Sequence, residues 1–258
     1  MKRIYRIEYN GHPRHAVEEG GEWHLVEGDI FGDHRKADRL DGTGLSLLPP
    51  VMPSKIVCVG LNYKDHAAEQ NKPLPPEPLL FIKPNTCVVG PDDTIVLPEG
   101  VGRVDHEAEC AVVIGRRASH VPEAQADHYI FGITCINDVT ARALQEKGVG
   151  YTRAKGYDTF APLGPCIAKG LDYRAGLTVE GLVNGAVRQS SSTTQLIFPI
   201  PALVAFISNI MTLLPGDIIA TGTPSGIGAL TAGDRVTIRV EGVGELTNPV
   251  GQGIRLNK

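Results

Sequence analysis

Glu107 and Glu109 stand two positions apart at the start of an apolar run that extends to residue 114. In a β-strand, side chains at i and i+2 leave the same face, so these two carboxylates would project side by side. Carboxylates are almost never buried unless they are paired or coordinate a cation. Because the surrounding residues are apolar and belong in a core, we expect a divalent cation as their partner. The alternative is a solvent-exposed edge strand that carries both acids on its outer face.

A third candidate ligand, Asp138, ends a second apolar run that begins at residue 129. Three oxygen donors from two strand ends predict a site for a hard metal ion. Asp138 is alternatively the N-cap of a helix, because good helix formers occupy residues 139–147. Neither role excludes coordination.

His66 and Glu69 are three positions apart, so in a helical turn they share one face. A carboxylate next to an imidazole orients the ring and raises its basicity, which suits a general base near neutral pH. The alternative is an ordinary surface contact on a solvated helix. Prolines at 73, 75, 76 and 78 follow closely, which predicts a loop-flanked element able to act as a lid.

A glycine-rich segment occupies residues 220–228. It lacks the Gly-Lys-Ser/Thr ending of a Walker loop and the Gly-x-Gly-x-x-Gly spacing of a dinucleotide-binding turn, so it implies no nucleotide. What remains is a turn after an apolar strand, in which backbone N–H groups around Gly222 and the hydroxyl of Thr223 are free to hold an anion. The alternative is a tight turn that needs positive φ.

Composition excludes several classes of function. Of the 258 residues, 42% are hydrophobic, which suffices for a sizeable core. The net charge of -4 offers no broad basic field, so we expect binding neither to nucleic acid nor to an anionic membrane. The first residues are charged where a signal peptide would be apolar, and no run is long enough to span a membrane, which predicts a cytoplasmic protein. The five scattered cysteines predict buried thiols.

The organisation of the chain changes near residue 50. Residues 1–48 alternate apolar and polar over short stretches broken by Gly-containing turns, which predicts a small antiparallel meander. Prolines at 49, 50 and 53 follow, so we place a small N-terminal β domain at residues 1–53 and a larger domain at 54–258. Many short strands and only two clear helical patterns, 139–147 and 200–212, predict a mixed α/β, β-rich fold.

Taken together, the motifs resemble the fumarylacetoacetate hydrolase superfamily over roughly residues 54–250, in particular its bacterial 2-hydroxyhepta-2,4-diene-1,7-dioate isomerase and acylpyruvase-like members. They occur in the family's order: GLNY with His66 and Glu69 at 60–69, FIKP at 81–84, HEAE at 106–109, NDVTAR at 137–142, KGYDTF at 155–160 and TGTP at 221–224. An ordered set of six motifs is highly specific.

The resemblance implies a fold and a site. The fold is the family's distorted β-barrel, or β-roll, usually in a homodimer. The site holds Mg2+ or Mn2+ on the carboxylates matching Glu107, Glu109 and Asp138, with the His66–Glu69 dyad as base or water activator on a lid. Lys155 would stabilise negative charge beside the metal. Arg142, Gln145, Thr223 and Gly222 match positions that contact substrate.

Such a site suits small 2-oxo or 2-hydroxy-enoic acids, because a Lewis-acidic metal stabilises the enolate that forms when a carbon–carbon bond breaks or a proton moves. One site would therefore serve the hydrolysis of acylpyruvates or the isomerisation and decarboxylation of hydroxymuconate-type diacids, the latter being slightly favoured. An alternative is an oxaloacetate decarboxylase. A different class is a catalytically silent relative that binds a metal and a dicarboxylate without turnover.

Overall fold

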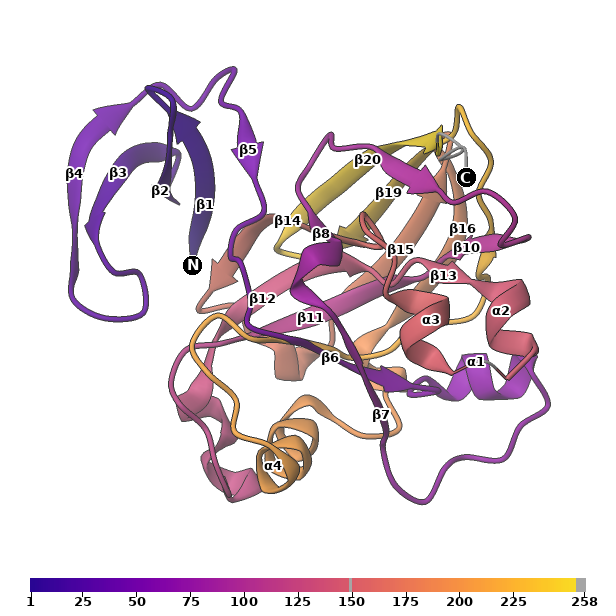
Figure 1. Ribbon diagram of the computed structural model, residues 1–258. Coiled ribbons are helices and arrows are strands. Elements are labelled where there is room, and N and C mark those ends of the chain that lie inside the picture. The colour runs from indigo at the N-terminus through magenta and orange to yellow at the C-terminus, as the bar shows by residue number, and fades with distance from the viewer. Residues whose placement is uncertain (149, 254–258) are drawn as a thin grey trace.

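The computed structural model describes residues 1–148 and 150–253, which form three β-sheets with short helices around them (Figure 1). The largest sheet follows the order β4 (His34–Leu40), β3 (Glu22–Gly28), β2 (His12–Glu19), β1 (Lys2–Tyr9), β14 (Ala161–Lys169), β12 (Ile130–Asn137), β11 (Ala108–Ile114), β17 (Ile218–Ala220), β6 (Ile56–Gly60) and β7 (Leu79–Lys83). Two short strands join it from the side, β5 (Leu47–Leu48) on β1 and β8 (Val88–Val89) on β14.

Two smaller sheets and the helices complete the architecture. One sheet has the order β13 (Thr140–Ala141), β10 (Val104–His106) and β18 (Gly228–Ala229), and the other β16 (Ala186–Ser192), β15 (Thr178–Val183), β19 (Arg235–Val240), β20 (Gly244–Gln252) and β9 (Ile95–Leu97). The α-helices are α1 (Lys64–Glu69), α2 (Arg142–Glu146), α3 (Tyr151–Lys155) and α4 (Ile200–Ile210). The 3-10 helices are η1 (Asn85–Cys87), η2 (Glu123–Tyr129), η3 (Tyr173–Ala175) and η4 (Thr193–Gln195).

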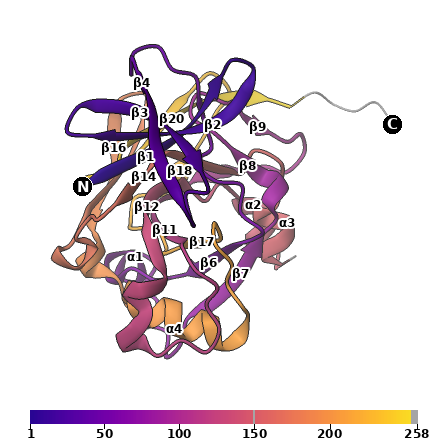
Figure 2. The ribbon, with the colours of Figure 1, turned by 90° about the vertical axis from the view of Figure 1, so that its left-hand side faces the viewer.

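The mixed, β-rich fold and the N-terminal meander are confirmed. Strands β1 to β4 form a curled antiparallel ribbon at one end of the molecule, and α4 lies at the opposite end (Figures 1 and 2). The ribbon is continuous with the main sheet, because β1 pairs with β14 in the register Lys2↔Lys169. The division into domains at residue 53 stays a prediction.

The strand pairing does not form the closed barrel that the resemblance implied. Over the described residues the main sheet runs as an open path from β4 to β7, and these two end strands do not pair with each other. Pairing is mostly antiparallel, with parallel contacts of β17 with β6, β8 with β14 and β9 with β20. The fold is thus a set of open, mixed sheets.

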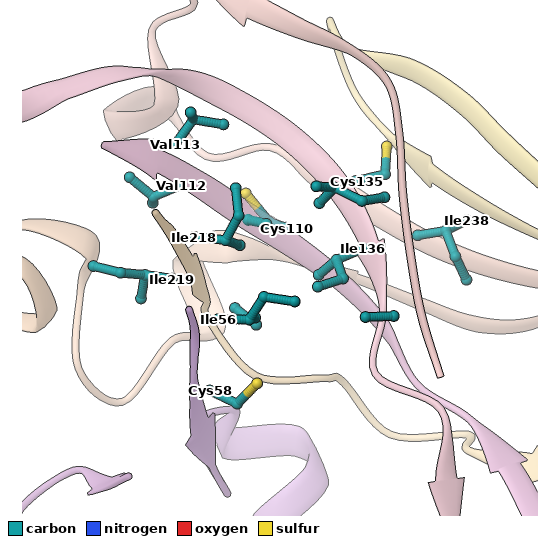
Figure 3. Close-up of a cluster of buried hydrophobic side chains, with 14 of the residues drawn as sticks. Ile56, Cys58, Cys110, Val112, Val113, Cys135, Ile136, Ile218, Ile219 and Ile238 are labelled. Atoms are coloured by element: carbon teal, nitrogen blue, oxygen red, sulfur yellow. The ribbon is translucent and has the colours of Figure 1, made fainter. Parts of the chain in front are cut away.

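The core of the molecule sits around β11, β12, β17 and β6. Their side chains are buried on both faces, which explains why these strands are uninterrupted apolar runs (Figure 3). Cys58, Cys110 and Cys135 are among them, and all five cysteines are buried free thiols, as expected. Strand β17 inserts between β11 and β6, which joins the segments near residues 57, 112 and 219.

Both helices that the sequence predicts are present, but one of them begins later than expected. The helix at 200–212 is confirmed as α4, which begins beside Pro201 in its first turn. The helix predicted at 139–147 begins too early, because Thr140 and Ala141 pair with β10 before the chain turns into α2 at Arg142. No helix among the described residues is long and apolar enough to cross a membrane.

Candidate active site

Three carboxylates converge where the start of β11 meets the end of β12 in the main sheet. Glu107 lies in the break between β10 and β11, Glu109 is the second residue of β11, and Asp138 follows β12 directly. One carboxylate oxygen from each lies within 4.8 Å of the other two. Their exposed fractions are only 6%, 2% and 1%, so the solvated edge strand is excluded. The N-cap of α2 is Ala141, so Asp138 does not cap that helix.

The backbone around Glu107 fixes this convergence. The sequence predicts one strand over this stretch, but the structure interrupts it at Glu107. There the amide of Glu107 donates to Oδ1 of Asn137 at 3.0 Å, and the amide of Asp138 donates to the carbonyl of Glu107 at 2.9 Å. These two bonds hold both carboxylate-bearing segments together, independently of anything bound between the side chains.

Buried cations compensate two of the three carboxylates. Nζ of Lys155 donates to Glu107 at 2.9 Å and also to Asp138, and Nζ of Lys83 donates to Oδ1 of Asp138 at 2.6 Å. Arg142 pairs with Glu107 and, at 2.9 Å, with Asp105. Lys83 has no role in the sequence-based prediction, although a lysine inside the apolar strand β7, ahead of a proline, is a visible signal.

Glu109 is left without a cationic partner. Among the described residues its one hydrogen-bond donor is the amide of Gly222, at 2.8 Å from Oε2. Burial, Asp138 and Glu107 raise the pKa of Glu109 well above its ordinary value. Burial alone would also raise the pKa of Glu107, but Lys155 and Arg142 outweigh it and lower the pKa to about 2.

The donor set therefore fits a divalent metal ion. It consists of oxygen ligands, which hard cations prefer. The three carboxylates are within reach of one ion. The uncompensated charge of Glu109 is the feature that a cation would neutralise.

The predicted dyad forms on α1. Nδ1 of His66 is 2.8 Å from Oε2 of Glu69, and the imidazole is buried while the Glu69 side chain is 42% exposed. The other oxygen of Glu69 accepts from the amide of Gly226 at 3.0 Å. Because an ionised carboxylate only accepts, Nδ1 carries the ring proton and Nε2 of the neutral ring keeps its lone pair. The contact is thus not between two surface side chains.

The glycine-rich loop supports the metal ligands. Gly222 has φ +101°, and a Cβ there would lie 2.8 Å from Cβ of Asn62, so the position requires glycine. The prediction that the Thr223 hydroxyl is free is wrong. This hydroxyl donates to the carbonyl of Ala108 at 3.0 Å and accepts from Nε2 of Gln189 at 2.7 Å. Its hydroxyl proton is therefore not available to an anion in this arrangement.

Gln189 is a second residue that the sequence prediction missed. It is fully buried, and its amide makes four hydrogen bonds. The oxygen accepts from the Ala108 amide at 2.9 Å and the His106 ring at 3.0 Å, and the nitrogen donates to Thr223 and, at 2.8 Å, to the carbonyl of Pro224. A glutamine among serines and an arginine on a hairpin strand carries no signal of this role.

One cavity of about 470 Å3 joins these groups. Predicted residues on its wall are His66, Glu107, Glu109, Asp138, Arg142, Gln145, Lys155 and Thr223. Gly222 is not among its lining residues, and its amide holds Glu109 instead. Gln145 accepts a hydrogen bond from Arg142, which itself holds Glu107. The sequence-predicted residues are therefore brought together, but Arg142 is engaged with carboxylates of the protein.

Comparison with known proteins identifies the family. A family model described as the C-terminal region of fumarylacetoacetate (FAA) hydrolase matches residues 55–251. The chain belongs to the fumarylacetoacetate hydrolase family. The crystal structure of a 5-carboxymethyl-2-hydroxymuconate delta-isomerase from Mycobacterium smegmatis shares 42% identity and a TM-score of 0.90, over 97% of this chain and 100% of that one.

Two other relatives within the family extend the range of chemistry. A mitochondrial oxaloacetate tautomerase of Xenopus laevis is 41% identical over 223 residues, which cover 82% of this chain and 70% of that protein. A maleylpyruvate hydrolase from Sphingobium sp. SYK-6, solved with manganese (II) and pyruvate, is 31% identical with a TM-score of 0.82, over 98% of this chain and 100% of that one.

Family membership and the buried acidic triad establish the general function. The protein is a metal-dependent enzyme of the fumarylacetoacetate hydrolase family that acts on small acids, and the buried triad Glu107, Glu109 and Asp138 suits a divalent metal ion. The individual roles of His66, Glu69 and Lys155 in catalysis stay predictions.

Proposed function

We propose that this enzyme uses Mg2+ or Mn2+ to act on small 2-oxo or 2-hydroxy-enoic acids through an enolate. The observation that carries the proposal is that one cavity holds the three buried carboxylates, the buried ammonium group of Lys155 and the imidazole of His66. A divalent cation held by the carboxylates would act as a Lewis acid that stabilises the enolate charge.

The protein's own groups have separate tasks in this proposal. His66 accepts and returns a proton at Nε2, and Glu69 keeps the ring oriented and stabilises its charged form. Lys155 places a fixed positive charge beside Glu107 and Asp138, whose negative charges raise its pKa against the effect of burial. An ammonium group that stays charged favours an anionic substrate and a developing enolate in a partly dry cavity.

Diacids are the substrates that we favour. The isomerase and the tautomerase among the relatives are both named for acids that carry at least two carboxylates and either an enolic 2-hydroxy group or an enolisable 2-oxo group. The cavity wall also includes Lys72, an exposed cation beyond α1 that is suited to a second carboxylate, and Glu146 is the opposing charge nearby on the wall. We therefore place isomerisation or decarboxylation of hydroxymuconate-type diacids ahead of hydrolytic cleavage of acylpyruvates.

Oxaloacetate is a second candidate substrate, because the Xenopus laevis relative at 41% identity is an oxaloacetate tautomerase. Interconversion of enol and keto forms requires the same proton transfer next to a 2-oxo group as the isomerisation. Loss of CO2 from oxaloacetate would use the same stabilised enolate.

An activity panel tests the proposal. The purified protein with Mg2+ or Mn2+ is assayed against a hydroxymuconate diacid, an acylpyruvate and oxaloacetate, with separate readouts for tautomerisation and CO2 release. We expect turnover of at least one diacid that disappears with chelator and falls roughly 100-fold or more in His66→Ala, at unchanged metal affinity. Metal binding without turnover of any of these acids would instead support the catalytically silent relative.

Lys72→Met tests the preference for diacids. Loss of one cation next to the second carboxylate should raise the KM for a diacid several-fold and leave the KM for a monocarboxylic acylpyruvate unchanged. Equal changes for both substrates would contradict the assignment of Lys72.

We also propose that the enzyme is a homodimer and that it is located in the cytoplasm.

A further inference from the structure

The reactive nitrogen of His66 already has a partner. Nε2 of the imidazole lies 2.7 Å from Nε2 of Gln70, the residue that ends α1. Gln70 also lines the cavity that contains the carboxylate triad. Both ring nitrogens are thus occupied by side chains of the same short helix, Glu69 on one side and Gln70 on the other.

The chemistry of the two partners determines what this contact does. Glu69 accepts the proton on Nδ1, so Nε2 of the neutral ring can only accept. The side-chain amide of Gln70 must then present its NH2 group to the lone pair, as it does here. That lone pair is the one that the proposed proton transfer needs, so no water or substrate can give its proton to His66 while the contact lasts.

We propose that Gln70 caps the catalytic nitrogen of His66 and that substrate must displace this cap before the base can act. The inference rests on the proposed function of His66 as the proton acceptor. Gln70 is a positioning residue, because its side chain holds the neutral imidazole in one tautomer. Substrate binding must break the hydrogen bond between Gln70 and His66, which makes the free energy of binding less favourable.

The geometry around Gln70 allows the cap to move without damage to the fold. Its backbone amide bonds to the carbonyl of His66 at 3.2 Å, which a side-chain substitution leaves intact. The helix is anchored elsewhere, by Asp65 to Ser191 and by Glu69 to Gly226. Methionine at position 70 keeps the length of the side chain and removes the donor.

Other charged groups neighbour His66 on α1 or line the same cavity, and the substitutions at residue 70 leave them unchanged. They are Asp65 and Glu69 on α1, Lys72 beyond it, Glu107, Glu109 and Asp138 of the triad, Lys155 on α3, and Arg142 and Glu146 on α2. A difference between wild type and a Gln70 variant at fixed pH therefore reports on residue 70 itself.

The direct test measures the reactivity of Nε2 without any substrate. Diethyl pyrocarbonate modifies neutral histidine, and peptide mass spectrometry follows His66 separately from the other histidines. Removal of the cap in Gln70→Met should increase the modification rate of His66 about 2- to 10-fold, as expected for one lost hydrogen bond. Gln70→Glu should decrease it, because a carboxylate at this position pairs with a protonated Nε2.

The opposite directions separate a cap from a structural role. If Gln70 only stabilised α1, both substitutions would loosen the helix and change the rate in the same direction, which would overturn the inference. Equal rates in wild type and Gln70→Met would overturn it as well. Lys64→Met is the matched control on the same helix, because Lys64 is exposed and a residue two positions before His66 does not share its face; it should match wild type.

Kinetics with the active substrate complete the test. Gln70→Met should lower KM about 2- to 10-fold with a smaller change in kcat, because binding no longer breaks a hydrogen bond. Gln70→Glu should shift the acidic limb of the kcat/KM profile to higher pH. If no acid is turned over, the proposed function fails while the modification rates still decide about Gln70. If turnover is found and the rates do not differ, the cap alone is refuted.

Discussion

Glu107 and Glu109 are two residues apart, yet the protein shifts their pKa values in opposite directions. Two cations lower the pKa of Glu107 in spite of its burial, whereas burial and two neighbouring carboxylates raise that of Glu109. In the metal-free protein the charge of Glu107 is compensated by cations, whereas a charge on Glu109 would be destabilising; we call Glu109 the strained ligand. The strained ligand is the one through which metal binding and protein stability are coupled.

The raised pKa of Glu109 predicts the pH dependence of the metal-free protein. A raised folded-state pKa means that the contribution of Glu109 is complete below its unfolded pKa of about 4.3 and is lost as pH rises through the folded pKa. The contribution of Glu107, with its folded pKa lowered to about 2, is present above about 4.3 and constant at higher pH. In chelator, we expect the free energy of unfolding to decrease as pH rises from about 5 upward.

Denaturant titrations at a series of pH values measure this slope. Glu109→Gln should flatten it and should make the metal-free protein at pH 8 more stable than wild type, while abolishing stabilisation by Mg2+. Glu123→Gln, an exposed acid on η2, is the control and should keep the wild-type slope. A wild-type slope in Glu109→Gln would contradict the assignment of strain to Glu109.

Removal of the Lys83 ammonium group should change both the stability of the protein and its response to metal. Lys83→Met leaves one oxygen of the buried Asp138 without its partner, so the metal-free protein should lose roughly 3–5 kcal/mol of stability. The site also gains one net negative charge, so Mg2+ should restore more stability in the variant than in wild type. Thermal unfolding with and without Mg2+ provides the comparison.

A matched pair elsewhere in the sheet serves as the control for Lys83. Lys55 pairs with the buried Asp217, outside the cavity. Lys55→Met should lower the melting temperature, but Mg2+ should shift it no further than in wild type. A similar metal response in both variants would show that Lys83 does not belong to the metal environment.

Strand β16 of the outer sheet supports the metal ligands through the side chain of Gln189. Gln189 reaches β11 and the loop at 221–224 with three of its four hydrogen bonds, and the fourth goes to His106 on β10. The same loop presents the amide of Gly222 to Glu109. Among the described residues the hairpin of β15 and β16 makes no hydrogen bond to Glu109, yet through Gln189 it helps to position this metal ligand.

Gln189→Met should reveal this dependence. Several buried donors and acceptors lose their partners, so stability should fall by at least about 3 kcal/mol. Metal affinity should fall about 10-fold or more, as for other groups that orient ligands. Isothermal titration with Mg2+ or Mn2+ and denaturant unfolding measure the two effects. Gln195→Met on the exposed turn η4 should change neither, and normal metal affinity in Gln189→Met would refute the supporting role.

The sequence predicts those parts of the site that depend on local chemistry. Two acids in an apolar run and a His–Glu spacing of three are visible because charge is expensive in a core and a helical turn has a fixed period. The break at Glu107 and the late start of α2 were missed, because both depend on pairing with strands far away in the sequence. The sequence does not reveal Gln189 for the same reason, since its partners are 34 to 83 residues distant along the chain.

An apolar surface of the molecule remains exposed. Leu80, Ile82, Phe206, Ile210 and Met211 line a shallow hollow of about 620 Å3 between β7 and α4. Ile82 is 41% and Ile210 58% exposed, which is unusual for adjacent large aliphatic residues on one face of a monomer. This face is our candidate for the interface of the proposed homodimer.

Light scattering after gel filtration tests the assembly. We expect a mass twice the 27.6 kDa of one chain, and Ile210→Lys should reduce it to the monomer mass by placing a charge in the apolar contact. Val187→Lys is the control, because Val187 is similarly exposed on β16 and distant from this face. A monomeric wild type would refute the homodimer, and a dimeric Ile210→Lys would exclude this face.

The insertion of β17 between β11 and β6 also affects the order in which the sheet can form during synthesis. Within the main sheet, β6 has only β7 and β17 as neighbours, so the β6–β7 hairpin and the attached α1 connect to the rest of this sheet through residues 218–220. During synthesis on the ribosome, residues 218–220 emerge long after β6, β7 and β11. The nascent chain therefore carries an unpaired edge on β11 until almost the whole protein has been made, and for the same time Glu69 on α1 lacks its contact with Gly226. We expect chains that terminate before β17 to be substrates for chaperones and proteases, and to have no partial activity.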